Sequence, residues 1–254
     1  MNNFEDYAKY YDLLYHDKDY TKEVDYVESL FKSNLNGDIN SILELGCGTG
    51  IHTKIFAERN YSIHAIDYSE EMISLAQKRA SSKDHLEKIV FHKGDVRNYR
   101  TDEKFDAIIS LFHVASYQTS EEDFENFIAT ARSHLKKGGI FIFDFWHKSA
   151  VLSEKPNLRI KRVKNKNHQL VRIAEPVIHT KRDVVDVNYE VFISDKKDNS
   201  YKSFKEKHPM RYFSCDFIKS KLIDIGFERT YFEEWLTKKV PSNKTWGVVS
   251  ISFL

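Results

Sequence analysis

The sequence has little cysteine and no local means of pairing it. Its 254 residues include two cysteines, Cys47 and Cys215, which stand far apart with no second Cys or closely spaced His beside either. A disulfide scaffold needs several cysteines at short spacing, and a structural zinc site needs a cluster of Cys or His ligands. We therefore expect neither a disulfide framework nor a metal site.

An excess of one charge and long apolar runs are also missing. The 39 Lys and Arg residues nearly cancel the 38 Asp and Glu residues, so no sequence-wide field exists to hold a nucleic-acid backbone or an anionic membrane. No apolar run approaches the ~20 residues of a membrane-spanning helix. Residues 1–5 also lack the basic and apolar segments of a secretion signal. The sequence predicts a cytoplasmic protein without a nucleic-acid or membrane partner.

From residue 41 onward, short apolar segments alternate regularly with amphipathic ones. The length and the 41% apolar content suit one large α/β domain with an insert. Such alternation is typical of a parallel sheet with helices on both faces. Expected strands cover residues 41–45, 62–66, 89–92, 105–111 and 140–145, and expected helices cover residues 52–59, 70–80 and 121–135.

Polar and glycine residues mark the ends of two of these helices. Ser69 and Ser120 each precede a run of carboxylates, which is typical of a helix N-terminus. Residues 136–139 are Lys-Lys-Gly-Gly, which predicts a left-handed glycine cap between the third helix and the next strand.

Segments of different character precede and interrupt this frame. Residues 4–35 combine aromatic and acidic side chains with apolar positions at helical spacing, and Asn-Gly-Asp at 36–38 ends the helix. We interpret residues 1–40 as an N-terminal helical lid. Residues 150–210 alternate between apolar and polar positions and contain turn-forming runs, which indicates an antiparallel β insert. That insert could bind the acceptor and could also mediate a homodimer.

The last part of the chain completes the frame. A helix over residues 214–225 and strands over 229–235 and 245–253 are expected. The predicted fold is therefore α/β, a Rossmann-like seven-stranded and mostly parallel sheet with an antiparallel β insert after the fifth strand. Its core covers residues 41–149 and 211–254.

The strongest motif is a run of glycines directly after the first expected strand. Residues 43–50 read Leu-Glu-Leu-Gly-Cys-Gly-Thr-Gly, with Gly46, Gly48 and Gly50 at alternate positions. Glycines there let the backbone turn tightly and approach a ligand that any Cβ would push away. Asp67 closes the second strand, where a carboxylate can accept hydrogen bonds from both ribose hydroxyls of an adenosine. The pair predicts a nucleoside site.

A nicotinamide dinucleotide fold also couples glycines to an acidic residue. Its fingerprint needs the third glycine at position 51, which is Ile51 here. The spacing and the preceding Glu44 fit a methionine-bearing nucleoside better, because no pyrophosphate then needs the helix N-terminus.

Three motifs in this order resemble those of class I S-adenosylmethionine-dependent methyltransferases. Residues 44–50 resemble their first motif, residues 67–69 with Met72 their second, and residues 94–96 their third. The resemblance implies S-adenosylmethionine as cofactor and S-adenosylhomocysteine as product. It implies that the first carboxylate and the glycines hold the methionine part, Asp67 the ribose, and the third motif the adenine edge. The implied cofactor-binding residues are Tyr11, Tyr20, Glu44, Gly46, Cys47, Gly48, Gly50, Asp67, Tyr68, Met72, Gly94, Asp95, Val96 and Leu111.

Within that family, the chain more closely resembles the N,N-dimethyltransferases of nucleotide-linked amino sugars. The resemblance covers most of the chain and rests on collinear segments at residues 11–15, 18–20, 94–97, 112–117 and 210–213. It implies methyl transfer to a small molecule, in surface-polysaccharide or secondary metabolism. The segments after Asp144 and at residues 241–247 depart from the pattern of those enzymes, so both a nitrogen and an oxygen acceptor on a sugar stay open.

Methyl transfer from a sulfonium is an in-line displacement, so alignment and exclusion of water matter more than a strong base. A polar side chain near the methyl group can still take a proton from the acceptor. By position, Tyr15 in the lid and His113 and Tyr117 after the fourth strand are the catalytic candidates. For each of them a purely structural role, as packing or as a strand-end cap, stays open.

Candidates for acceptor binding lie after the fifth strand and in the insert. Trp146 and His147 fall at the carboxyl edge of the sheet, where ligands of such folds collect. Arg159 and Arg162 belong to a basic stretch, and Arg211 ends the insert; each could pair with the diphosphate of a nucleotide-linked sugar. A solvated basic face is the alternative for this stretch.

Other functions remain open at this level. The fold alone does not fix the acceptor. A different metabolite, a protein or an RNA could receive the methyl group, although the near-zero net charge disfavours RNA. A protein that binds the adenosyl nucleoside without turnover is a further alternative.

Overall fold

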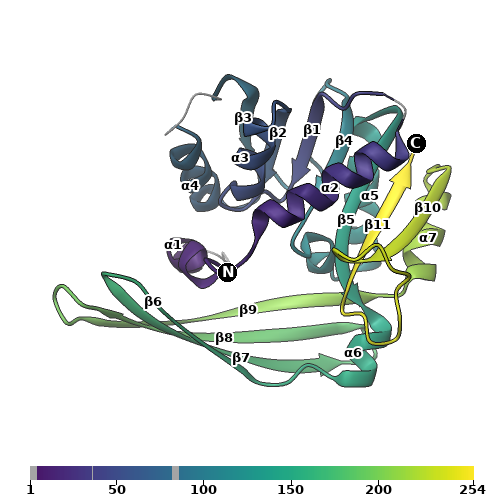
Figure 1. The fold of residues 1–254 in the computed structure, drawn as a ribbon. Helices are drawn as coiled ribbons and strands as arrows, with labels where there is room; N and C mark the ends of the chain where they lie inside the picture. Colours follow the sequence, from purple (N-terminus) through teal and green to yellow (C-terminus); the bar gives the residue numbers. More distant parts are fainter. Residues whose placement is uncertain (1–4, 36, 82–85) are drawn as a thin grey trace.

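The structure is a computed structural model that describes residues 5–35, 37–81 and 86–254. The predicted N-terminal helical segment starts at Phe4, and the run predicted to end it starts at Asn36. Both residues lie outside the described residues. An α/β unit stands above a long antiparallel sheet, and the N-terminal helix α1 lies between them (Figure 1). This arrangement leaves the carboxyl ends of the parallel strands facing the long sheet.

The α/β unit contains a twisted sheet in the order β3-β2-β1-β4-β5-β11-β10, in which β11 runs antiparallel to both of its neighbours. The parallel strands carry continuous apolar runs because helices cover both faces. The strand bounds are β1 Ser41–Leu45, β2 Ser62–Asp67, β3 Ile89–Lys93, β4 Phe105–Ser110, β5 Leu135–His147, β10 Arg229–Glu234 and β11 Gly247–Phe253. The predicted fold class and all seven core strands are confirmed.

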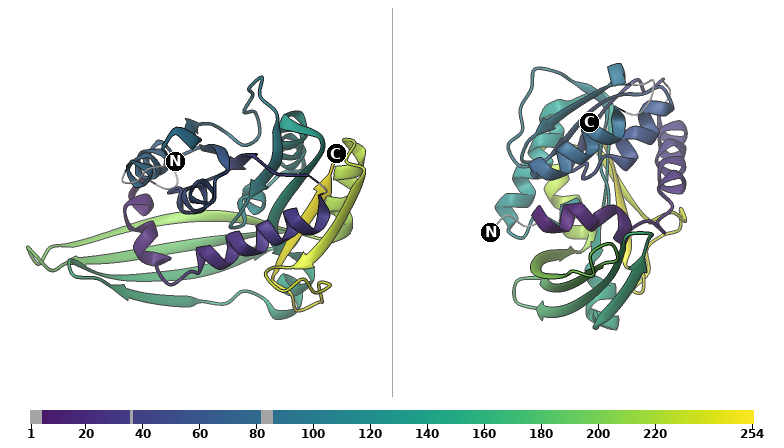
Figure 2. Two further views of the ribbon diagram at one scale, coloured as in Figure 1. Left: turned by 45° about the horizontal axis from the view of Figure 1, so that its top comes forward. Right: turned by 90° about the vertical axis from the view of Figure 1, so that its left-hand side faces the viewer.

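Helices cover the sheet in two layers (Figure 2). One face packs against α2 and α3 through residues such as Val27, Phe56 and Ile142. The other packs against α5 and α7 through a cluster rich in phenylalanine that includes Phe127 and Phe143. The helix bounds are α2 Tyr20–Asn34, α3 Ile51–Glu58, α4 Glu70–Ala80, α5 Glu121–His134, α6 Lys148–Glu154 and α7 Cys215–Asp224, with short 3-10 helices η1 Leu86–Lys88 and η2 Val114–Tyr117.

The helix N-termini follow the sequence, but one predicted C-terminus does not. Ser69 and Ser120 accept hydrogen bonds from the backbone N–H groups three residues on, as predicted. The predicted glycine cap at residues 136–139 is wrong, because α5 ends at His134 with Leu135 already extended. Gly138, with φ of 76°, instead lies inside β5, where the β4–β5 register shifts between Phe105 and Ala107.

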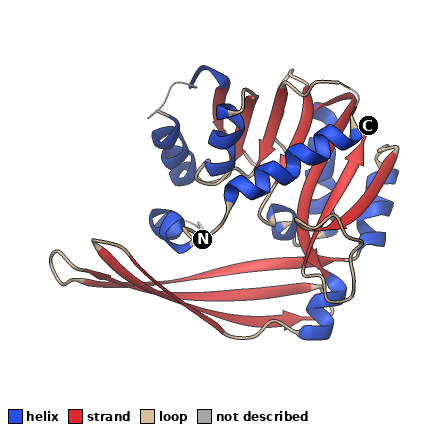
Figure 3. Cartoon of the chain, viewed as in Figure 1, coloured by secondary structure: helices blue, strands red, loops and turns tan. Residues whose placement is uncertain are grey.

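The insert is an antiparallel sheet of long strands, as predicted, with α6 leading into it (Figure 3). Its strands are β6 Arg159–Lys164, β7 His168–His179, β8 Val184–Asp195 and β9 Tyr201–Phe213. The end of β9 pairs in parallel with Trp146 and His147 of β5, beyond the point where β4 ends. This pairing joins the insert to the core sheet at its carboxyl edge.

The N-terminal region forms two helices, α1 Glu5–Leu14 and α2 Tyr20–Asn34. The amphipathic α2 packs on the core, whereas α1 packs with β6 and α4. The predicted lid therefore divides into a cover, α1, and a core helix, α2. Among the described residues no helix is long and apolar enough to cross a membrane.

Phe143 lies at the centre of the phenylalanine cluster and is fully buried. We expect Phe143→Ala to lower the free energy of unfolding by about 3–5 kcal/mol, because it leaves a cavity between β5 and α5. Urea denaturation measures this change. Phe192→Ala, at a half-exposed position on the insert, is the control and should cost much less; equal losses would contradict the packing described here.

Candidate active site

A cavity of about 640 Å³ lies between the carboxyl edge of the core sheet, helix α1 and the inner face of the insert. Its volume falls within the ordinary range of small-molecule sites. The core side contributes the glycine loop, Asp67, Met72 and residues 111–114; the insert side contributes alternate residues of β7, β8 and β9. Ligands of open α/β sheets bind at this edge, where the strands end.

The loop after β1 forms one wall, and glycine is required there for two different reasons. Gly46 has φ of 82°, and a Cβ on it would lie 2.7 Å from a methyl carbon of Val114. Gly48 has φ of 54°, but no atom lies within 4 Å of the place of its Cβ. Both line the cavity. The first glycine therefore permits close packing of the loop on η2, and the second leaves the backbone open toward a ligand.

Asp67 at the end of β2 holds this loop in place. Its carboxylate accepts hydrogen bonds from the backbone N–H of Gly48 at 2.8 Å and from that of Ser69 at 2.9 Å. Burial raises the pKa of Asp67, and these N–H groups counteract the rise. A carboxylate offers about four acceptor positions, so it can still accept two ligand hydroxyls in the cavity.

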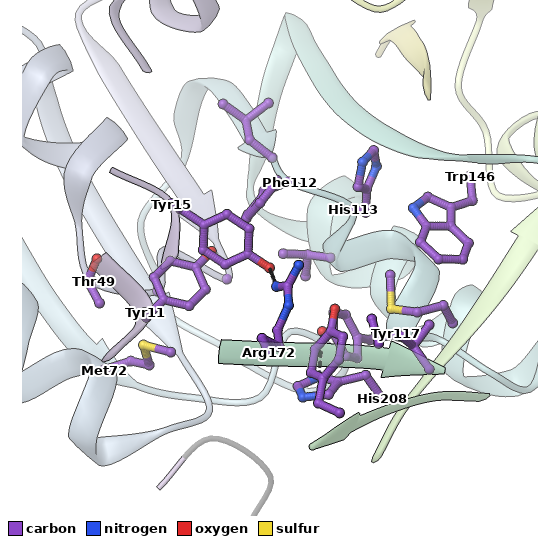
Figure 4. Close-up of a pocket in the computed structure, with 18 of the residues that line it drawn as sticks. Tyr11, Tyr15, Thr49, Met72, Phe112, His113, Tyr117, Trp146, Arg172 and His208 are labelled. Carbon is purple, nitrogen blue, oxygen red and sulfur yellow. Dashed lines mark hydrogen bonds between the residues drawn. The ribbon is translucent and has the colours of Figure 1, made fainter. Parts of the chain in front are cut away.

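Helix α1 bridges the two sides of the cavity. Asp12 accepts a hydrogen bond from the Thr49 hydroxyl at 2.7 Å and pairs with Arg79 of α4. Toward the insert, Arg172 of β7 donates to the Tyr15 hydroxyl at 3.0 Å, as Figure 4 shows. Tyr11 of this helix and Tyr15, directly after its end, line the cavity. These contacts fasten the C-terminal end of α1 to both sides of the cavity.

The turn after β4 is strained. Phe112 and His113 both adopt left-handed φ values, 69° and 64°, which cost energy in residues with a Cβ and often mark functional sites. Buried Asp144 of β5 holds the turn, because it accepts the His113 backbone N–H at 2.9 Å and lies 2.8 Å from His113 Nδ1. The Phe112 ring packs edge-on against Tyr15, with centroids 5.0 Å apart. This turn places His113 on the cavity wall.

The inner face of the insert forms the opposite wall. Alternation along the strands puts Arg172, Ala174 and Pro176 of β7 on this face, together with Val187 and Tyr189 of β8 and His208 and Met210 of β9. Tyr117 of η2 reaches this wall, where its hydroxyl lies 2.9 Å from His208 Nδ1. Trp146 and Trp246 meet edge to face at 6.1 Å and close the far end.

Comparisons with known proteins agree with this geometry. A family described as a methyltransferase domain matches residues 42–139. Over 143 residues the chain is 32% identical to a dTDP-3-amino-3,4,6-trideoxy-alpha-D-glucopyranose N,N-dimethyltransferase of Streptomyces venezuelae; the alignment covers 56% of this chain and 57% of that relative. The chain thus matches little more than half of the relative's length.

Solved structures match over nearly the whole chain. One is an S-adenosylmethionine-dependent methyltransferase from Clostridium acetobutylicum, with a TM-score of 0.84 and 24% identity over 99% of this chain and 98% of that one. Another is an amino pentose methyltransferase from Micromonospora echinaspora with S-adenosylmethionine bound, with a TM-score of 0.76 and 20% identity over 99% of this chain and 98% of that one. This chain has the class I methyltransferase fold. The segment that matches the methyltransferase domain family, residues 42–139, contains the glycine loop and Asp67.

The methyltransferase fold brings most of the predicted site residues to one cavity. Those that line it are Tyr11, Tyr15, Tyr20, Gly46, Cys47, Gly48, Asp67, Met72, Leu111, His113, Tyr117, Trp146 and Arg159. Their individual roles stay predictions.

Several predicted cofactor residues do not line the cavity. Gly50 packs against Ala76, and Tyr68 is largely exposed. Gly94 donates its N–H to the Asp67 carbonyl, which places the third motif beside Asp67, behind the wall. Asp95 is paired with Arg97, and Val96 packs into the apolar core. The structure does not bring these side chains to the cavity.

Glu44 also lies behind the loop. It is fully buried, accepts a hydrogen bond from the Thr53 hydroxyl and does not line the cavity. Burial raises the pKa of Glu44 to about 8, and the nearby Asp67 adds to the rise. The predicted contact of Glu44 with the cofactor is therefore replaced by a contact with helix α3.

Three predicted acceptor residues point elsewhere. Arg162 occupies the strand position between two inward residues, so it lies on the outer face of β6, and it does not line the cavity. Arg211 is likewise on the other face of β9 and packs over Phe213 and Phe217. His147 is buried and makes a hydrogen bond with the Thr245 carbonyl at 3.2 Å. The structure does not support acceptor contacts for these three.

Much of the insert's inner wall was not predicted from the sequence, including Arg172, Tyr189 and His208. One signal was present: Glu206 and His208 stand on a strand face whose other members include Phe204, Met210 and Tyr212. Charged or polar side chains on a mostly apolar strand face are candidates for a buried functional site. Which face of each strand turns inward could not be read without the register.

The raised pKa of Glu44 predicts a pH effect on stability. The pKa of Glu44 in the folded protein is about 8, above the ordinary value of 4.5. Between these pH values the carboxyl is ionised in the unfolded chain but protonated in the folded protein, so the stability of the fold decreases as pH rises. We expect Glu44→Gln to remove this loss, so its stability relative to wild type should increase from pH 5.5 to pH 8.5. Urea denaturation without ligand tests it, with Glu190→Gln as control. A constant difference across this range would contradict the assignment.

Proposed function

We propose that this chain transfers the methyl group of S-adenosylmethionine to an amino group of a nucleotide-linked sugar. The observation that carries the proposal is the continuity of the cavity, which runs from the glycine loop and Asp67 to the arginine and aromatic side chains of the insert. A donor and an acceptor can therefore meet in one space. Two of the similar proteins named above, from Streptomyces venezuelae and Micromonospora echinaspora, are named as methyltransferases of amino sugars, which supports nitrogen as the acceptor atom.

On the core side, Asp67 would bind the ribose hydroxyls and Gly48 would leave room for the backbone to approach the donor. Met72 lines the same region and would pack against the adenine. The Tyr20 hydroxyl is buried without a hydrogen-bond partner among the described residues, and it could donate to the methionine carboxylate. Tyr11 and Phe112 would face the sulfonium, whose positive charge is attracted to aromatic faces.

On the insert side, Arg159 and Arg172 supply the positive charge that a sugar nucleotide diphosphate requires. Trp146 and Trp246 would flank the acceptor at the far end. The reaction itself is an in-line displacement, in which the acceptor lone pair attacks the methyl carbon and the C–S bond electrons stay on sulfur. Alignment and exclusion of water by α1 are the protein's main contributions.

An oxygen acceptor on a related sugar is the alternative, because the segments after Asp144 and at residues 241–247 depart from the amino-sugar pattern. A homodimer through the insert also stays a prediction, which sedimentation velocity can test.

Donor binding is tested first, by titration calorimetry with S-adenosylmethionine and S-adenosylhomocysteine. We expect Asp67→Ala to weaken binding roughly 100-fold, because two hydroxyls lose a charged hydrogen-bond partner. Asp198→Asn, in an exposed turn of the insert, is the control and should bind as wild type does. Absence of heat with the wild-type protein would overturn the proposed function.

The acceptor is tested with labelled donor and a panel of nucleotide-linked amino and hydroxy sugars, followed by product masses. We expect Arg159→Ala to raise the acceptor KM about 10-fold or more, with donor affinity unchanged. Arg162→Ala, on the same strand but the opposite face, should leave KM unchanged. If both variants raise KM equally, the cavity face of β6 is not the acceptor side.

A further inference from the structure

The inner face of β6 carries two cations at the edge of the cavity. Arg159 lines the cavity, and Lys161 follows two positions along the strand, so both side chains emerge on the same face of the insert. Buried Val163 continues this face toward the hairpin tip. In the register of β6 with β7, Lys161 stands directly opposite Arg172, which also lines the cavity. Three cations are therefore gathered on one part of the wall.

An acidic side chain meets this group from the connector between α1 and α2, residues 15–19. The Asp17 carboxylate lies 2.7 Å from the Lys161 ammonium, which also lies 5.7 Å from the ring centroid of Tyr15. The hydrogen bond from Lys161 lowers the pKa of Asp17, so the carboxylate is ionised at neutral pH. Lys161 itself does not line the cavity. Asp17 thus holds the third cation beside the connector, next to the space that the other two cations face.

This ion pair is exposed enough to be exchanged for another. The Asp17 side chain is 59% exposed and that of Lys161 is 27% exposed. Exposed ion pairs contribute little to stability, because water solvates the separated partners well. A diphosphate carries more negative charge than one carboxylate and offers more acceptor oxygens. It can therefore displace Asp17 from the lysine.

The exchange leaves the connector in place, because other residues anchor it. Lys18 pairs with the buried carboxylate of Glu23, and Asp19 caps α2 by accepting the Lys22 backbone N–H. Asp17 precedes both anchors and is itself exposed. A rotation of the Asp17 and Lys161 side chains is then sufficient, without movement of α1 or α2.

The spacing of the two β6 cations suits a diphosphate. Alternate residues of a strand lie ~7 Å apart, and the long side chains of Arg159 and Lys161 can converge from that distance on two neighbouring phosphates. An arginine forms paired hydrogen bonds with one phosphate, and a lysine supplies a compact charge to the next. Like charges directly opposite each other, as Lys161 and Arg172 are, destabilise a sheet. A bound anion removes that repulsion.

We propose that Asp17 is an internal competitor for the diphosphate of the acceptor, and that Lys161 is the cation for which the two compete. The inference rests on the proposed function. Without acceptor, Asp17 occupies Lys161. The incoming diphosphate displaces the carboxylate and gains Lys161 in addition to Arg159. The methylated product carries the same diphosphate, so Asp17 competes with it in turn and speeds its release.

A structural clamp is the other role that an Asp–Lys contact can have, and the two roles predict different signs. If the contact only fastened the connector to β6, loss of either partner would loosen the wall and weaken anion binding. A competitor gives opposite effects, because loss of the acid strengthens anion binding and loss of the lysine weakens it. Asp17→Asn is the informative change, since asparagine keeps the shape and can accept a hydrogen bond from Lys161 but lacks the charge.

Titration calorimetry of the full chain at low ionic strength tests the proposal, with inorganic pyrophosphate and a nucleoside diphosphate as probes. We expect Asp17→Asn to tighten the binding of both probes about 3–5-fold. Lys161→Ala should weaken it about 10-fold. In the double variant the effect of Asp17→Asn should vanish, because no lysine remains to compete for. Lys164→Ala, on the outer face of the same strand, and Asp198→Asn, in an exposed turn, are the controls and should bind as wild type does.

Weakened or unchanged binding in Asp17→Asn would identify a clamp or a bystander and would overturn the proposal. Absence of binding of both probes to the wild-type and Asp17→Asn proteins would do the same. A tightening that persists in the double variant would exclude Lys161 as the contested cation. Neither probe needs a donor or turnover. If the probes bind as expected but no sugar of the panel is methylated, the proposed function fails while the exchange at Lys161 stands.

Discussion

The site depends on the carboxylate of Asp67. By accepting N–H groups from Gly48 and Ser69, it joins the loop after β1 to the loop after β2. These two loops meet because β1 and β2 pair in parallel and end at the same edge. Burial raises the pKa of Asp67, and backbone donors that need no rearrangement counteract this rise. Asp67 also lines the cavity, so one side chain shapes the glycine loop and, in the proposed function, binds the ribose of the donor.

The core could be predicted from the sequence because its signals are local. Apolar runs, Ser69 and Ser120 as caps, and the glycine loop each act within a few residues. The error at residues 136–139 arose where a long-range constraint overrode a local one: β5 begins immediately after α5, and Gly138 is used in the irregular pairing of β4 with β5. Gly138 adopts the left-handed φ that the sequence predicts, but it does so inside a strand and not at the end of a helix.

The insert shows where sequence reasoning ends. Its alternation was visible, yet alternation gives two faces and does not say which one is buried. Arg159 and Arg162 differ by three positions and so fall on opposite faces, and the register with β7 decides between them. Pairing across β8 and β9 likewise assembles Tyr189, Glu206 and His208 from separate strands. Contacts of this kind depend on tertiary structure, so the sequence pattern indicates them only weakly.

The near-zero net charge conceals a cavity with opposed local charges. The core side presents Asp67, which suits a cationic sulfonium donor, whereas the insert side presents Arg159 and Arg172, which suit an anionic acceptor. Helix α1 spans both sides through Asp12 and Tyr15. Covering the cavity removes water and strengthens each of these interactions. If the proposed donor and acceptor bind as their charges predict, each side of the cavity attracts its own ligand and disfavours the other, and the order of charges along the cavity then orients the methyl carbon toward the nucleophile.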